Sequence, residues 1–290
     1  MAVQDAILAL TIDVEGLAES HAESVRVPSE FLTAAHNDAE IARNLPVVLD
    51  LLAQHECRAT FFFLGRIARS APQLVRAVVA AGHEIACHSL EHRRLTGQPW
   101  EAFRTEVRGA RKYLEDASGT AVIGYRAPEF SVGRANLWVL DELAEAGFRY
   151  DSSVVPTGWH DVYGMPGMPR QVYRWPNGLV EFPLPVMSIL GVKVPMGGGG
   201  YFRLFPWRWT RRFLRHRLLK SIPTVFYIHP YEIGPEATDL PGLSRLRRFR
   251  HYIRLRQGHE RFGRLMEGLP FTTAADVLTR AGFLGENASG

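Results

Sequence analysis

Two histidines four residues apart are the first feature of this sequence that could carry chemistry. His88 follows a short apolar run, Glu84 to Cys87, and His92 comes four positions later. The run is typical of a buried strand, and residues at i and i+4 share a face if the chain then enters a helical turn. Two imidazoles so placed can bind one metal ion, but a third protein ligand, preferably a carboxylate, must come from elsewhere. A pair of surface histidines is the alternative interpretation.

Four other polar residues stand in comparable positions. Asp13, Arg126, Asp151 and His229 each fall at, or just after, the end of a predicted strand. The order strand, loop, helix repeats along the chain, which favours a parallel sheet with helices outside it. In a (β/α) barrel the carboxyl ends of the strands converge on one face, where catalytic groups collect. We therefore expect these residues to share one site.

Hydrophobic runs and capping signals predict the elements that position this site. Strands are expected at 6–12, 59–64, 84–87, 122–125, 150–152 and 224–228, and helices at 44–55, 70–81, 100–117 and 136–146. Asn44 is expected to cap the first helix, with Pro46 in its first turn. The irregular stretch 16–43 before it predicts a lid or binding loop. Residues 242–281 predict a C-terminal helical extension of a single domain that spans 1–290.

Five short segments, taken in order, resemble the motifs of the polysaccharide deacetylase family, also called carbohydrate esterase family 4. They are TIDVE at 11–15, HSLEH at 88–92, RAP at 126–128, the surroundings of Asp151, and the Ile228-His229 pair. The segments 197–203 and 249–252 resemble a bacterial subfamily found with exopolysaccharide and exosortase systems. The resemblance implies a deformed (β/α) barrel that uses a divalent metal, usually zinc, to remove N- or O-acetyl groups from sugars.

One departure from the family pattern concerns the metal ligands. The commonest family form has two adjacent aspartates, one a base and one a metal ligand, but Val14 occupies the second place here. Successive side chains of a strand point to opposite faces, so residues 13 and 15 share a side. Glu15 can therefore supply the missing carboxylate, and the expected metal ligands are Glu15, His88 and His92.

The resemblance also implies roles for the remaining residues. Asp13 is the expected base that takes a proton from water, and Arg126 beside it would keep this carboxylate charged. His229 is the expected acid for the departing amine, with Asp151 as its partner. An ion pair without a part in the chemistry is the alternative for Arg126 and Asp151. The residues expected to bind the oxyanion or the substrate are Pro128, Glu129, Phe130, Trp159 and Tyr201.

The composition is that of an ordinary globular protein. Hydrophobic residues make up 46% and charged residues 22% of the 290 positions, which allows a large buried core. The first ten residues lack a basic flank before their apolar run, and no stretch approaches the roughly 20 apolar residues of a membrane-spanning helix. Without an export signal, Cys57 and Cys87 are expected to be reduced and buried. These features predict a soluble, cytoplasmic protein.

Basic residues gather in two segments. Residues 206–220 hold six Arg or Lys and no acid, and residues 242–264 hold eight Arg against one Glu. Apolar residues recur at helical spacing in the second segment, so its arginines are expected on a solvated helix face. A weak contact with an anionic membrane or with phosphate is the alternative. No nucleic-acid-binding motif accompanies these segments, and no nucleic acid is expected as a partner.

The leading prediction is a metal-dependent hydrolase, with zinc as the expected ion. It would remove acetyl groups from N-acetylated amino sugars of a glycan or a glycan precursor, so that a carbohydrate is the expected partner. Two alternatives remain open. One is a related hydrolase of another C–N amide bond, of the allantoin or formyl-amide type, and the other is a glycan-binding protein without turnover.

Overall fold

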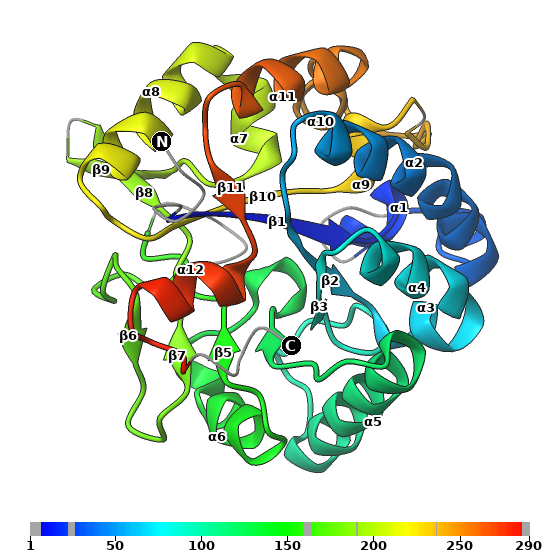
Figure 1. Cartoon of the computed structure of the whole chain (residues 1–290). Coiled ribbons are helices and arrows are strands. Elements are labelled where there is room, and N and C mark those ends of the chain that lie inside the picture. Colours follow the sequence, from blue (N-terminus) through cyan, green and yellow to red (C-terminus); the bar gives the residue numbers. More distant parts are fainter. Residues whose placement is uncertain (1–6, 23–26, 159–163, 190, 236, 286–290) are drawn as a thin grey trace.

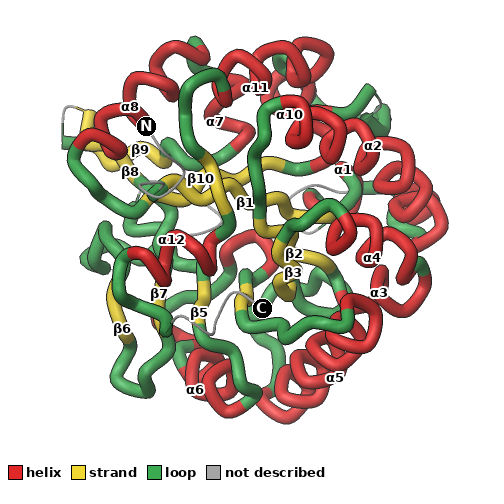
Figure 2. The backbone as a smooth tube through the Cα atoms, in the orientation of Figure 1, coloured by secondary structure: helices red, strands yellow, loops and turns green. Residues whose placement is uncertain are grey.

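The computed structural model of the chain describes residues 7–22, 27–158, 164–189, 191–235 and 237–285. Its centre is a sheet with the strand order β10-β1-β2-β3-β4-β5-β7-β6, in which β11 also pairs with β1. These pairs are parallel except for β6 with β7. The sheet curls, and helices surround it (Figures 1 and 2). The expected α/β fold, a deformed (β/α) barrel with outer helices, is confirmed.

The strands are short, as is usual for a barrel of this kind. In chain order they are β1 (Leu8–Val14), β2 (Thr60–Phe63), β3 (Glu84–Cys87), β4 (Gly124–Tyr125), β5 (Tyr150–Asp151), β6 (Tyr173–Arg174), β7 (Val180–Glu181), β8 (Val186–Ile189), β9 (Val192–Pro195), β10 (Thr224–Ile228) and β11 (Phe271–Thr272). Strands β8 and β9 form a separate antiparallel hairpin. Each of the six strands expected from the sequence has a counterpart among them.

The helices connect these strands or cover their ends. They are α1 (Leu17–Ser20), α2 (Ala34–Gln54), α3 (Gly65–Ser70), α4 (Pro72–Ala80), α5 (Trp100–Ser118), α6 (Trp138–Glu145), α7 (Gly199–Leu204), α8 (Trp207–Leu219), α9 (Pro230–Ile233), α10 (Arg245–Tyr252), α11 (Gly258–Met266) and α12 (Ala274–Arg280). The helix expected over 70–81 is α4, and α3 precedes it as a further short helix. None of the helices in the described ranges is long and apolar enough to cross a membrane.

The side chains of β1 divide between two cores. Leu8, Leu10 and Ile12 pack in the larger core between the sheet and the outer helices. Ala9 belongs to a smaller cluster on the other face of the sheet, inside the barrel. Asp13 is buried and lies four residues after Ala9. Because side chains an even number of residues apart point to the same face of a strand, its carboxylate is directed toward the barrel interior.

Helix α12 closes the end of the barrel at which the strands begin. Its residues pack in the inner cluster together with Ala9 and Phe62. The backbone N–H of Ala274 donates to Thr60 Oγ1, and that of Ala275 donates to the Glu84 carboxylate. In Figure 1 this helix lies in front of the strands. Within the predicted C-terminal extension, residues 271–280 thus contribute a short strand and a closing helix to the barrel.

The segment 16–43 is more regular than the sequence predicted. It contains α1 and the first turns of α2, which begins at Ala34 with Thr33 as its cap, the Thr33 side chain accepting from the His36 N–H. Asn44 does not cap the helix but is buried inside it. Pro46 is also tolerated in the helix interior, although it removes one backbone hydrogen bond. Packing of the apolar face of α2 on the core outweighs this local cost.

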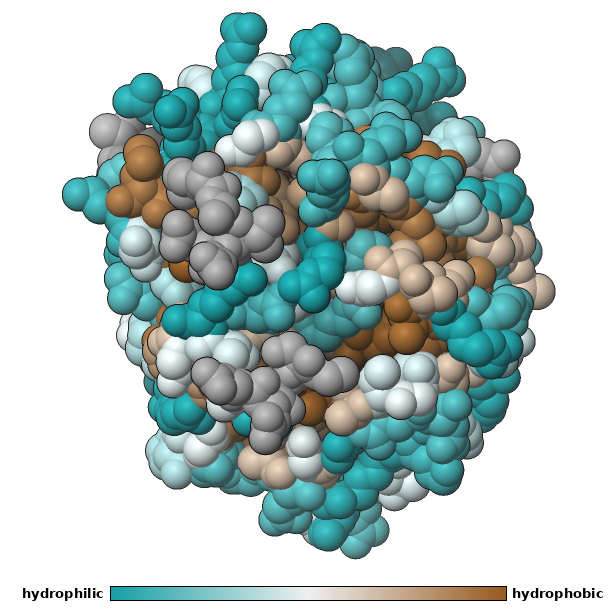
Figure 3. All heavy atoms as spheres, in the orientation of Figure 1, coloured by the Kyte–Doolittle hydropathy of each residue, from teal (hydrophilic) through white to brown (hydrophobic). Residues whose placement is uncertain are grey.

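The two cysteines and the surface agree with the composition. Cys57 and Cys87 are free and buried, as expected, and burial raises the pKa of the Cys87 thiol to about 12. Figure 3 shows mostly hydrophilic residues over the outer helices, with apolar residues in the recesses between them on this face.

Gly65 provides the first test of this packing. A Cβ added at Gly65 would lie 2.6 Å from Ala110 Cα in α5, so backbone must move to admit it. We expect Gly65→Ala to lower the free energy of unfolding by about 1–3 kcal/mol, measured by urea unfolding followed by circular dichroism.

Gly109→Ala, in α5 itself, is the matched control. The added methyl group meets nothing within 4 Å, so helix propensity should leave stability unchanged or raise it by up to about 1 kcal/mol. Equal effects of the two substitutions would contradict the close contact of α3 with α5.

Candidate metal centre and its surroundings

The loop after β3 carries the two histidines that the sequence singled out. His88 continues β3 inward, and its ring lies 5.2 Å from that of His92, measured between ring centroids. The loop is not the helical turn that we expected, because Ser89 and His92 adopt positive φ angles of 69° and 54°. A left-handed backbone at a non-glycine residue costs energy and often marks a functional site. The rings are nevertheless brought to one side of the chain.

Glu15, just past the end of β1, meets both rings. Its Oε2 atom lies 3.4 Å from His88 Nε2 and in closer contact still with His92 Nε2. All three side chains are buried, and their ligand atoms lie within 4.8 Å of one another. Among the described residues this is the group of three that could hold a metal ion. The structure therefore assembles the ligand set expected from the sequence.

Two observations indicate that this group suits a metal ion. Glu15 Oε2 and His92 Nε2 are buried against each other, and neither atom makes a hydrogen bond of normal geometry, which a bound cation would remedy. His88 Nδ1 lies 2.8 Å from the carbonyl oxygen of Arg126, so this nitrogen donates its proton and Nε2 keeps its lone pair for a ligand bond. Two imidazoles and one carboxylate are a donor set of catalytic zinc sites.

The charges of the group are arranged for binding a cation. Burial alone would raise the pKa of Glu15, but the charge of His92 and the close contacts with the His229, His88 and His92 rings hold that pKa well below its ordinary value. Burial would lower the pKa of His92, but the nearby Glu15 carboxylate outweighs burial and raises that pKa. Glu15 is thus an ionised carboxylate in the barrel interior.

Asp13 belongs to a different pair. Its Oδ1 accepts a hydrogen bond of 2.6 Å from Arg126 Nη1, and both side chains are buried. Arg126 also donates to Thr11 Oγ1 and to Ser152 Oγ, and its guanidinium lies 4.2 Å from the centroid of the Phe62 ring. Removing one partner of such a buried pair typically costs about 3–5 kcal/mol. Arg126 therefore fixes Asp13 with its side chain and His88 with its carbonyl oxygen.

His229 completes the group from the end of β10. Its Nε2 lies 3.1 Å from Glu15 Oε1, and its Nδ1 lies 3.0 Å from Glu232 Oε2. Burial would lower the pKa of His229, but the hydrogen bonds with Glu15 and Glu232 outweigh burial and raise it to about 10. The sequence predicted Asp151 as the partner of His229. The partner in the structure is Glu232.

Glu232 is in turn held by Arg203 of α7. Arg203 Nε donates to Glu232 Oε1 over 2.7 Å, and Arg203 Nη1 donates to the carbonyl oxygen of His251 at the end of α10. Burial would raise the pKa of Glu232, whereas Arg203 and His229 lower it to about 2. Sequence reasoning missed Glu232. The available signal was the spacing His-x-x-Glu at a helix start, which forms a capping box here.

The four glycines at 197–200 let α7 approach this pair. A Cβ on Gly198 would lie 2.6 Å from the Tyr227 ring, and one on Gly199 would lie 1.9 Å from the Glu232 carboxylate. The N–H of Tyr227 also donates to the Gly197 carbonyl. Only residues without a side chain fit between α7 and the end of β10.

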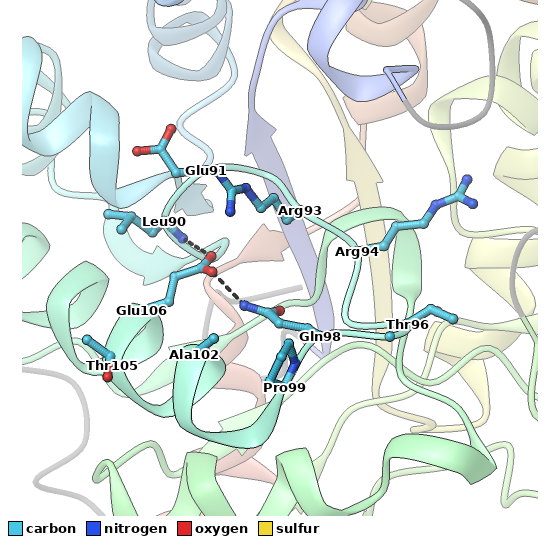
Figure 4. A pocket seen from close by; sticks show the side chains of 11 residues that line it. Leu90, Glu91, Arg93, Arg94, Thr96, Gln98, Pro99, Ala102, Thr105 and Glu106 are labelled. Atoms are coloured by element: carbon cyan, nitrogen blue, oxygen red, sulfur yellow. Dashed lines mark hydrogen bonds between the residues drawn. The ribbon is translucent and has the colours of Figure 1, made fainter.

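The loop that carries His88 and His92 is anchored on two sides. The N–H groups of Gly65 and Arg66 in α3 donate to the carbonyl oxygens of Ser89 and Leu90. Figure 4 shows the second anchor, in which Glu106 of α5 accepts from the Leu90 N–H and from the Gln98 side chain. A cavity of about 800 Å³ lies beside this loop and is lined by it and by α5. The anchors fix the loop although its backbone is irregular.

The segment after β4 lies against the same site. Pro128 and Phe130 are buried, and the Phe130 ring lies 5.0 Å from that of Tyr227. Glu129 forms an ion pair with Arg94 and has a φ of 48°. Its negative charge contributes to the raised pKa of His92. Tyr201 lies half-buried in α7. Trp159, the fifth residue expected to bind substrate, lies outside the described residues.

Asp151 does not face the site. Tyr150 belongs to the inner cluster, so its neighbour in β5 points outward, opposite Tyr125 of the outer core and Glu181 of β7. Ser152 takes the inward place instead. Asp151 Oδ1 accepts from Ser153 Oγ over 2.6 Å, and burial raises the pKa of Asp151 to about 6. The catalytic role expected for Asp151 has no geometric support.

Burial and the charge of Asp151 likewise raise the pKa of Glu181, so this carboxyl pair retains a proton in the folded protein. A carboxyl whose pKa is higher in the folded than in the unfolded state contributes stability below pH 4, and the contribution is lost as the pH rises through about 6. In Asp151→Asn an amide that does not titrate replaces the carboxyl group. We expect the free energy of unfolding of Asp151→Asn, relative to that of the wild type, to rise by about 1–3 kcal/mol as the pH increases from 4 to 8. Urea unfolding at each pH measures this difference.

Asp116→Asn, at an exposed position of α5, is the control and should show no such gain. A difference between wild type and Asp151→Asn that is constant over this pH range would rule out the retained proton.

Comparison with known proteins places two family models on the chain. Residues 30–150 match the polysaccharide deacetylase model, and residues 152–279 match a domain of unknown function (DUF3473). A chitooligosaccharide deacetylase of Sinorhizobium fredii is 35% identical over 137 residues, which are 46% of this chain and 60% of the relative. The peptidoglycan-N-acetylglucosamine deacetylase PgdA of Listeria monocytogenes is 29% identical over 127 residues, 41% of this chain and 27% of the relative. The matches thus span three fifths or less of these relatives.

Two solved structures resemble the fold as a whole. One is a crystal structure from Mycobacterium smegmatis assigned to the polysaccharide deacetylases, with a TM-score of 0.60, 19% identity and coverage of 95% of this chain and 89% of that one. The other is a PuuE allantoinase, with a TM-score of 0.60, 15% identity and coverage of 95% and 90%. Residues 30–150 thus match the polysaccharide deacetylase family, and the chain as a whole shares its fold with these two structures.

Proposed function

We propose that this protein is a metal-dependent N-deacetylase that hydrolyses the acetamide of N-acetylated amino sugars in a glycan or a glycan precursor. The observation that carries the proposal is the buried group of Glu15, His88 and His92, with His229 and the Asp13–Arg126 pair against it. The relatives named above, which remove acetyl groups from amino sugars, support the substrate class.

Zinc is the ion that we propose for this group, because the nitrogen and oxygen donors match those of catalytic zinc sites with an open position. When bound, such an ion would lower the pKa of a water molecule and polarise the acetyl carbonyl group. Glu15, His88 and His92 would hold it. The hydrogen bond from His88 Nδ1 to the Arg126 carbonyl fixes the tautomer that this requires.

The residues around the group supply the proton transfers. Asp13, oriented by Arg126, takes a proton from the water molecule while the water oxygen forms a bond to the acetyl carbon. The backbone N–H of Glu129 is proposed to stabilise the oxyanion. His229 donates a proton to the sugar nitrogen as the C–N bond breaks, which leaves acetate and a free amine. Glu232 is a positioning residue that supports the charged form of His229.

The second candidate is hydrolysis of another C–N amide bond. The allantoinase matches the fold as well as the deacetylase structure does, and such an enzyme would use the same ligands and the same proton transfers. A panel that includes allantoin and a formyl amide separates the two functions. We expect turnover with N-acetylhexosamine substrates alone.

Acetate release tests the proposal directly. Purified protein should release acetate from N-acetylglucosamine oligomers, lose this activity on chelation and regain it with zinc. His92→Ala should reduce the activity more than about 100-fold, because even residues that only orient metal ligands contribute about 10–100-fold.

His216→Ala, at an exposed position of α8, is the matched control and should keep full activity. Activity that survives complete removal of metal would refute the proposed mechanism. Acetate release by His92→Ala at the wild-type rate would refute the ligand assignment.

A further inference from the structure

The charges of this protein are unevenly distributed along the chain. Residues 206–220 and 242–264 hold 14 of the 34 Lys and Arg residues but only one of the 30 acidic residues. The rest of the chain, with 20 basic and 29 acidic residues, is acidic. The helices of the two basic segments, α8, α10 and α11, lie on the same side of β1, in the upper half of Figure 1. The positive charge of these segments is therefore gathered on one side of the barrel.

Large apolar side chains are exposed in the same part of the chain. Of the eight that are exposed in the described ranges, five lie between residues 204 and 249. Leu246 and Phe249 of α10 are two of them, 69% and 55% exposed. The sequence predicts the arginines of this segment on a solvated helix face, and Arg245 and Arg247 are exposed. Leu246 and Phe249, however, are exposed beside them instead of packing on the core.

Contacts at both ends of α10 hold the helix in this orientation. Just before it, Leu243 packs against a small core cluster. In its last turn, Tyr252 packs against the same cluster, and its hydroxyl group donates to the Thr238 carbonyl oxygen over 2.7 Å. Leu246 and Phe249 lie three residues apart and therefore on one face of the helix. Their exposure follows from the packing of an anchored helix and not from a frayed end.

We propose that Arg245, Leu246, Arg247 and Phe249, which we call the α10 face, bind the surface of an anionic lipid bilayer. Basic helices that also expose Leu and Phe lie in the plane of such a surface. Their apolar side chains enter the boundary between headgroups and acyl chains, while the arginine side chains reach the anionic headgroups. This inference does not depend on the proposed function.

The mixture of positive charge and apolar area identifies the occupant. A nucleic acid would also attract the arginines, but it is held through phosphate contacts, which give Leu246 and Phe249 nothing to bury against. A second copy of the chain would bring two basic faces together across a symmetric interface, and like charges repel. An anionic bilayer offers negative charge and an apolar interior to the same face.

Vesicle sedimentation with the full chain tests the proposal. We expect binding to vesicles of phosphatidylcholine mixed with phosphatidylglycerol, no binding to vesicles of phosphatidylcholine alone, and weaker binding as salt is added. Equal binding to both kinds of vesicle, or binding to neither, would overturn the proposal.

Two double variants separate the contributions of charge and apolar area. Arg245→Gln/Arg247→Gln should weaken binding about 10-fold or more, because each arginine at an anionic surface contributes about fivefold. Leu246→Ala/Phe249→Ala should weaken binding about 10-fold, because less apolar area leaves the water. All four side chains are exposed, so both variants should fold, which circular dichroism checks.

Matched pairs elsewhere on the surface are the controls. Arg76→Gln/Arg170→Gln removes two exposed arginines outside the basic segments. Leu32→Ala/Trp100→Ala removes two apolar side chains that are 40% and 43% exposed. Both variants should bind vesicles as the wild type does, and losses equal to those of the α10 variants would contradict the assignment to α10.

A DNA duplex in the same titrations tests the competing occupant. Duplex binding much weaker than vesicle binding, with vesicle binding lowered in both α10 variants, supports the bilayer. If Leu246→Ala/Phe249→Ala binds vesicles like the wild type and the duplex binds as tightly as the vesicles do, the arginines recognise any polyanion. That result would overturn the proposal.

Discussion

The site depends on one buried carboxylate, that of Glu15. It stands at the end of β1, the strand that pairs with β10 on one side and β2 on the other. One of its oxygens faces His88 and His92 and the other faces His229. A buried charge is costly unless it is paired or binds a metal, so this carboxylate gathers cationic or metal-binding partners around it. The ends of β3 and β10 are positioned to provide them.

Both halves of the chain contribute side chains to the candidate site. The part that matches the polysaccharide deacetylase model contains His88 and His92. The part that matches the domain of unknown function contributes His229, its partner Glu232 and the buried Arg203. The four glycines before Arg203 make this contact sterically feasible. The contacts of α7 therefore give the second half a physical role in the site, and not only in the barrel.

Residue patterns predicted the parallel sheet with outer helices, the His88/His92 pair and the shared side of residues 13 and 15, and the family resemblance added the deformed barrel and the Asp13–Arg126 pair. They failed where an element is too short to show its period. Strand β5 has two residues, so nothing in the sequence shows that Ser152 points inward and Asp151 outward. Glu232 escaped prediction because its contact arises only when the chain turns into a helix directly after His229. The start of α2 was misplaced because packing of its apolar face outweighs the stop signal of a proline.

The most direct test of the account is the metal content of two variants. Glu15→Ala and Asp13→Asn would be loaded with zinc, dialysed and analysed by plasma mass spectrometry, with circular dichroism to show that both are folded. If Glu15 is the third ligand and Asp13 the base, Glu15→Ala loses the ion, and Asp13→Asn keeps it but no longer turns over. Equal loss of metal from both variants would contradict this division of roles and show that the two carboxylates share the ion.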